Sequence, residues 1–108
     1  MSGTKREGQG GSSTVFADES KDKPEKPPLF KVLLHNDDYT TMEFVVYILE
    51  SIFFRPPEEA HKIMMAVHQR GVGVAGVYTY EIAEAKVEKT MRLARAKVFP
   101  LRLTIQEE

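Results

Sequence analysis

The chain contains no cysteine and has no excess of charge of either sign: 15 basic and 16 acidic residues leave a formal net charge of −1. Without cysteine, disulfide bonds, thiolate metal sites and a cysteine nucleophile are excluded. The missing basic excess disfavours nucleic-acid binding, which depends on a positively charged surface. The sequence also lacks an apolar run near the ~18 residues of a membrane span, and it lacks a secretory signal. We therefore expect a cytoplasmic protein that binds neither membrane nor nucleic acid.

The first quarter of the chain has few large apolar side chains. Residues 1–28 are rich in Gly, Ser, Lys, Glu and Pro, so they cannot bury enough apolar surface to offset the entropy lost on ordering. We predict a flexible, disordered N-terminal extension over residues 1–28. The remaining residues, 29–108, are numerous and apolar enough to form one small domain with one core.

The folded part opens with a strand signal. Residues 29–34 alternate, with one face made of Phe30, Val32 and Leu34. The turn "HNDDYT" ends this strand. Thr40 followed three residues later by Glu43 forms a capping-box pattern, which predicts a helix over residues 41–54.

Prolines and glycines mark the elements that follow. Pro56 and Pro57 should end the first helix and open a second one, which Gly71 should end. "GVGVAGVYTY" predicts a strand, bulged at a glycine. A third helix should begin near Thr79 or Tyr80, with charged residues outward, Lys86 among them, and a core stripe of Ala83, Val87, Met91, Ala94 and Val98.

The last stretch, "FPLRLTIQ", alternates like a half-exposed strand. The predicted fold class is α+β: a small α/β sandwich in which a three-stranded antiparallel sheet packs on three helices in the order β-α-α-β-α-β.

Histidines and carboxylates are the residues best suited to bind a metal or another ligand. A metal- or small-molecule-binding domain could use His35, Asp37, Asp38, His61 and His68, although their spacing fits no named metal motif. The sequence contains no G-x-S-x-G elbow, so no motif of this kind indicates a hydrolase. Asn-Asp-Asp is also an ordinary turn, in which Asp37 and Asp38 together would contribute about 1 kcal/mol or less to stability. The residues alone indicate a small binding or adaptor module, with the metal- or small-molecule-binding domain as the alternative.

Four stretches, "FKVLLHNDDYTTMEFVVYIL", "IMMAVHQRG", "GVYTYEIAEAKV" and "FPLRLTI", resemble in order and spacing the corresponding stretches of the ClpS family. The resemblance covers residues 29–106. ClpS proteins are bacterial adaptors, not enzymes, that deliver N-degron substrates to the ClpAP protease. The resemblance therefore implies an α/β sandwich that binds substrates beginning with Leu, Phe, Tyr or Trp. We expect a monomer without metal or cofactor.

The resemblance also implies roles for individual residues. The free α-amino group of the substrate would be held by Asn36, Asp37, Asp38 and His68. An N-terminal ammonium is mostly cationic near neutral pH and carries three donors, which these side chains can accept. The pocket for the first side chain would be lined by Leu34, Thr40, Met42, Val45, Met64, Val67 and Leu101.

The resemblance implies further roles, one at the pocket entrance and others away from the pocket. Met42 would act as a gate against β-branched Ile and Val. Glu81 and Lys86 would dock the N-domain of the ClpA unfoldase, and the N-terminal extension would enter its channel. Two departures from the family matter here: Thr41 stands where many relatives carry proline, and His35 stands where a small apolar residue is common. Strand alternation predicts that His35 points away from the pocket.

Overall fold

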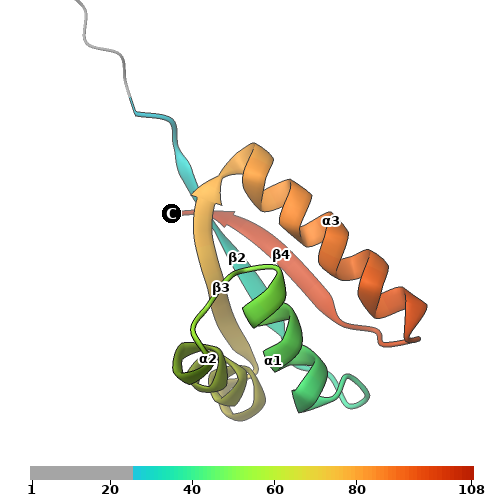
Figure 1. Cartoon of the computed structure of the whole chain (residues 1–108). Coiled ribbons are helices and arrows are strands. Elements are labelled where there is room, and N and C mark those ends of the chain that lie inside the picture. Colours follow the sequence, from blue (N-terminus) through green and yellow to red (C-terminus); the bar gives the residue numbers. More distant parts are fainter. Residues whose placement is uncertain (1–25) are drawn as a thin grey trace, which may run out of the picture.

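The computed structural model describes residues 26–108 (Figure 1). Most of the extension predicted over residues 1–28 lies outside the described residues. The order β-α-α-β-α-β and the three-stranded sheet are confirmed, with the elements β2 (Leu29–His35), α1 (Met42–Ser51), α2 (Pro57–Arg70), β3 (Val72–Thr79), α3 (Tyr80–Ala96) and β4 (Arg102–Glu107). Within the described part of the chain, no helix is long and apolar enough to cross a membrane.

The sheet has the order β3-β2-β4, and both pairings are antiparallel, as predicted. Alternate residues of β2 point to opposite faces, so Val32 and Leu34 are buried under the helices while Leu33 remains partly exposed. A bulge is present in β3 as predicted, but the extra residue is an alanine and not a glycine. Val32 pairs with Gly76 and the next residue of β2 pairs with Val74, which leaves Ala75 as the extra residue of β3.

The start of α1 differs from the prediction. Thr41, not Thr40, is the N-cap: its backbone is extended, and its Oγ1 accepts a hydrogen bond from Phe44 N at 3.1 Å. The capping box of Thr40 and Glu43 is therefore wrong. Because proline has no side-chain acceptor, threonine at position 41 provides a cap that a proline there would lack. Thr40 is instead engaged with the loop before the helix.

Helix α1 also ends earlier than predicted, at Ser51 instead of residue 54. Phe54 adopts a left-handed backbone conformation with φ of 56°, which stops the helix, and Arg55 N donates to Leu49 O at 2.9 Å. Pro57 then opens α2, and Gly71 ends it with φ of 90°, both as predicted.

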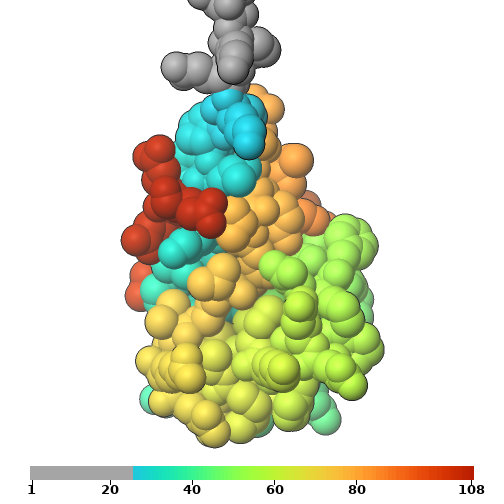
Figure 2. Space-filling view, turned by 90° about the vertical axis from the view of Figure 1, so that its left-hand side faces the viewer, coloured from blue at the N-terminus to red at the C-terminus, as the bar shows by residue number. Residues whose placement is uncertain are grey.

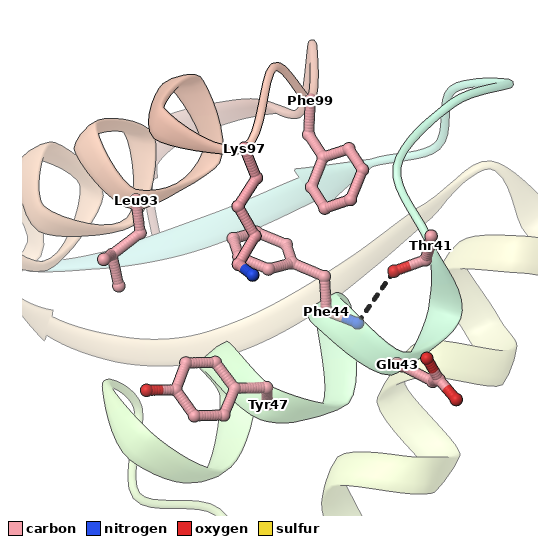
Figure 3. A pocket seen from close by; sticks show the side chains of 7 residues that line it. All are labelled: Thr41, Glu43, Phe44, Tyr47, Leu93, Lys97 and Phe99. Carbon is pink, nitrogen blue, oxygen red and sulfur yellow. Dashed lines mark hydrogen bonds between the residues drawn. The ribbon is translucent and has the colours of Figure 1, made fainter.

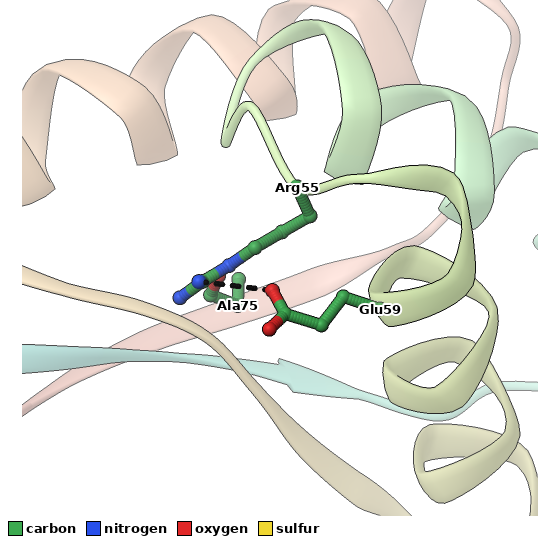
Figure 4. A network of polar contacts seen from close by, with 3 residues as sticks. All are labelled: Arg55, Glu59 and Ala75. Carbon is green, nitrogen blue, oxygen red and sulfur yellow. Dashed lines mark hydrogen bonds and ion pairs between the residues drawn. The ribbon is translucent and has the colours of Figure 1, made fainter.

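Helix α2 is fastened to β3 at both ends. Near its beginning, Arg55 Nε donates to the carbonyl of the bulge residue Ala75 at 2.8 Å, and its guanidinium pairs with Glu59 at 3.3 Å (Figure 4). Near its end, a Cβ added at Gly73 would lie 2.8 Å from Val67 Cγ2, so the missing side chain permits the close approach. The space-filling view shows α2 directly beside β3 (Figure 2).

The core stripe predicted for α3 is correct from Ala83 to Ala94 and wrong at Val98. Ala83 and Ala94 are fully buried, whereas Val98 lies beyond the helix and is 85% exposed. Thr90 is also buried on this face. Its hydroxyl donates to Lys86 O at 2.7 Å, so burial leaves no unsatisfied donor.

Val98 provides a stability prediction. It adopts φ of 62°, and a β-branched residue in the left-handed region is strained by roughly 1–2 kcal/mol. Asparagine tolerates this conformation far better, so Val98→Asn should raise the free energy of unfolding by about 1 kcal/mol. Urea denaturation of both proteins measures the difference. A less stable variant would show that the exposed valine makes a compensating contact.

Candidate functional site

The candidate site lies where β2 and α2 end. The loop after β2 is tied to the end of α2 by a hydrogen bond from Asn36 N to Gly71 O at 2.9 Å. This bond brings the loop beside the last turn of α2, which carries His68. Two segments that are distant in the sequence therefore meet at one edge of the molecule.

A hollow of about 250 Å³ opens at this meeting point. The structure brings together all but two of the residues for which the sequence suggested a substrate-binding role: Asn36, Asp37, Asp38, Thr40, Met42, Val45, Met64, Val67 and His68. The two exceptions, Leu34 and Leu101, are fully buried in the core and do not line the hollow. Their contribution is to the packing of the core and not to the wall itself.

The hollow has an apolar interior and a polar rim. Val45, Met64 and Val67 are buried, and they come from the facing helices α1 and α2. Asn36, Asp38 and His68 are exposed. Such an arrangement can bury an apolar side chain while acceptors at the rim bind a neighbouring hydrogen-bond donor.

Asp37 organises the loop. Its Oδ1 accepts hydrogen bonds from Tyr39 N at 2.8 Å and Thr40 N at 2.7 Å, and its Oδ2 accepts from the Thr40 hydroxyl at 2.7 Å. Burial raises the pKa of Asp37, but the hydrogen bonds from Thr40 and Tyr39 outweigh burial, and the net pKa is lowered. Asp37 therefore has a larger structural share than expected for a turn residue.

His35 lies outside the hollow, as strand alternation predicted. Its Nε2 is 2.8 Å from Thr104 Oγ1 on the neighbouring strand β4. Burial lowers the pKa of His35, and the charge of Arg102 lowers it further. The five residues of the alternative metal site do not assemble: among residues 26–108, no three His, Cys, Asp or Glu side chains are grouped to hold a metal ion.

The lowered pKa of His35 predicts a pH dependence of stability. A base whose pKa falls on folding is protonated more readily in the unfolded chain, so stability decreases as pH drops below the ordinary value of 6.5. Thermal unfolding between about pH 8 and pH 5 should show this loss, and His35→Gln should reduce it. Asp37 adds a second loss below its ordinary value of 3.8. An equal slope in the variant would assign the first loss to other groups.

The two predicted docking residues differ in their exposure to solvent. Glu81 is exposed in the first turn of α3. Lys86 is only partly exposed, contrary to the outward position expected: its Nζ donates to Ile52 O at 2.7 Å, beyond the end of α1. Burial lowers the pKa of Lys86, and the charge of Lys89 lowers it further. Periodicity places a residue on a helix face but does not reveal a hydrogen bond to a carbonyl that is distant in the sequence.

A larger groove of about 520 Å³ was not anticipated (Figure 3). It lies between α1 and the end of α3, where the rings of Phe44 and Phe99 pack edge to face with centroids 5.1 Å apart. Its other lining residues are Thr41, Glu43, Tyr47, Leu93 and Lys97. No motif marks it, because its walls come from segments that meet only in the folded chain.

The fold is a small α+β domain in which three helices pack on a three-stranded sheet. Its apolar hollow with a polar rim gives it the form of a ligand-binding domain. The family model described as ATP-dependent Clp protease adaptor protein ClpS matches residues 25–104. The chain belongs to the ClpS family. As the resemblance implied, it is an N-degron adaptor that delivers substrates to the Clp protease.

Two relatives match this chain over its whole length, and one solved structure matches most of it. The ATP-dependent Clp protease adapter protein ClpS of Rhodospirillum centenum is 48% identical over 108 residues, covering 100% of both chains. That of Caulobacter vibrioides strain NA1000 is 51% identical over 111 residues, again covering 100% of both. The structure of Agrobacterium tumefaciens ClpS2 bound to L-phenylalaninamide aligns with a TM-score of 0.73 at 37% identity, covering 77% of this chain and 100% of that one.

Proposed function

We propose that this adaptor recognises the free α-amino group together with the first side chain of substrates that begin with Leu, Phe, Tyr or Trp. One observation carries the proposal: a single hollow joins exposed acceptors, Asn36, Asp38 and His68, to a buried apolar wall. Asp37 would contribute its negative charge and hold the loop in shape.

The acceptors suit an ammonium group. An amide oxygen, a carboxylate and a neutral imidazole nitrogen can each take one of its three N–H donors. Asp37 already accepts three hydrogen bonds within the loop, which favours Asp38 as the carboxylate nearer to the substrate. Acetylation removes the charge and leaves one neutral donor, so it should abolish most of this binding.

The interior suits an aromatic first side chain or an aliphatic one that is not branched at Cβ. Its hollow of about 250 Å³ is walled by Val45, Met64 and Val67, with Met42 at its edge. L-phenylalaninamide, the ligand of the Agrobacterium relative, combines a free α-amino group with an apolar ring. Met42 would exclude Ile and Val, whose branch at Cβ lies next to the rim.

For delivery, we propose that Glu81 and the region around Lys86 dock on the N-domain of the ClpA unfoldase. The extension over residues 1–28 would enter the unfoldase channel. The adaptor would act in the cytoplasm as a monomer, without a cofactor and without catalysing a reaction.

Calorimetric titration with three short peptides tests the proposal. They begin with free Leu, acetylated Leu and free Ile. Burial of a side chain and two or three charge-assisted hydrogen bonds predict a dissociation constant on the order of micromolar for free Leu. Acetylation should weaken binding by at least about a hundredfold, and Ile should bind markedly less well. Equal binding of the three peptides would contradict the proposal.

A further inference from the structure

The end of α1 explains the backbone conformation of Phe54 but not its aromatic side chain. Its side chain is 75% exposed, and its backbone has φ of 56°, in the left-handed region that disfavours bulky residues. Glycine or asparagine would end α1 at this point without strain and without an exposed aromatic ring. Outliers of this kind concentrate at functional surfaces.

Lys86 holds the exposed ring in place. Its Nζ lies 4.6 Å from the centroid of the Phe54 ring, within the range of a cation–π interaction. The same ammonium donates to Ile52 O at 2.7 Å, which fixes it at the end of α1. Lys86 therefore supports the ring from α3, and most of the ring surface still faces solvent.

The ring continues the surface that the proposed function assigns to docking. A hollow of about 190 Å³ beside it is lined by Ser51, Ile52, Phe54, Ala85, Lys86 and Lys89. Ala85 lies one helical turn after Glu81 and therefore on the same face of α3. Ile82, one turn before Lys86, is also exposed and adds apolar area to this side of the helix.

Charge on this surface is divided between two sides of α3. Glu81 shares one hollow with the exposed Glu84 and Glu88, whereas Lys86 and Lys89 line the other hollow, beside the ring. A complementary partner would present a cationic group opposite Glu81, carboxylates opposite the lysines, and an apolar cleft for the ring between them. A folded domain can supply all three at fixed positions, whereas a lone cation or small molecule cannot.

We propose that Phe54 is the apolar anchor of the surface that docks on the N-domain of the unfoldase, and that Lys86 is a positioning residue for its ring. The proposal rests on the proposed docking function and adds the residue that supplies most of its apolar contact. Aromatic side chains in the centre of an interface are the residues that most often dominate affinity.

The test compares two variants of the full chain that receive the same substitution in the same backbone conformation. Phe54→Asn removes the ring, and Val98→Asn changes an exposed residue with φ of 62° beyond the far end of α3. Both should retain or raise the melting temperature and bind the Leu peptide as the wild type does. Only Phe54→Asn should weaken binding to the isolated ClpA N-domain, by about tenfold or more. Phe54→Tyr, which keeps a ring, should restore most of the affinity.

The outcomes separate this inference from the function on which it rests. If Phe54→Asn binds the N-domain like the wild type while Glu81→Lys weakens binding, docking stands and the anchor role is wrong. If the wild type does not bind the N-domain at all, the proposed docking fails. If Phe54→Asn loses stability and peptide binding together, the ring is structural, and the inference is overturned.

Discussion

Replacing Asp37 by alanine should lower both the affinity for a peptide with N-terminal Leu and the stability of the domain, whereas Asp38→Ala should lower the affinity alone. The three hydrogen bonds that Asp37 accepts from Tyr39 and Thr40 shape the loop, and all three are lost in alanine. We expect a loss of about 1–3 kcal/mol in the free energy of unfolding. Affinity should fall by more than about tenfold in both variants.

Asp37→Asn is the matched control for the charge. Its side-chain oxygen can still accept from Tyr39 N and Thr40 N, so most of the stability should remain while the attraction for an ammonium decreases. Denaturation and peptide titration on the same preparations measure the two effects. An Asp37→Ala variant with unchanged stability would show that the loop holds its shape without the carboxylate.

Replacing Met42 by alanine should admit peptides that begin with Ile or Val, improving their binding by about tenfold or more while Leu and Phe peptides are retained. Met42 lines both the candidate hollow and a second, shallow hollow of about 300 Å³. Its side chain, 42% exposed, therefore stands between the two spaces. Removing it joins them and leaves room for a branch at Cβ.

Val46→Ala is the control for this prediction. Val46 lines the shallow hollow and does not line the candidate hollow, so the substitution enlarges only the outer space. Binding of Ile peptides should not improve. If Ile binding remains weak in Met42→Ala, the discrimination belongs to the buried walls Val45, Met64 and Val67.

The sequence by itself determined the order of the elements, the start of β2 and both ends of α2. Alternation in residues 29–34 predicted β2, and Pro57 and Gly71 predicted the ends of α2, because periodicity, fixed φ angles and left-handed caps act within a few residues. The motif resemblance also selected the residues that the structure gathers in the hollow. The ends of these elements are encoded by residues close together in the chain. The resemblance rests on the order and spacing of the four motif stretches.

Only the tertiary structure decided how those residues are used. It selected Thr41 over Thr40 as the cap of α1, because the hydroxyl of Thr40 donates to Asp37 instead. It brought Asn36 beside the end of α2 through the bond to Gly71 O, and it fixed Lys86 to the carbonyl of Ile52. Each of these contacts joins groups whose separation depends on how the loop and the helices pack in the folded chain. No local pattern of residues encodes that separation.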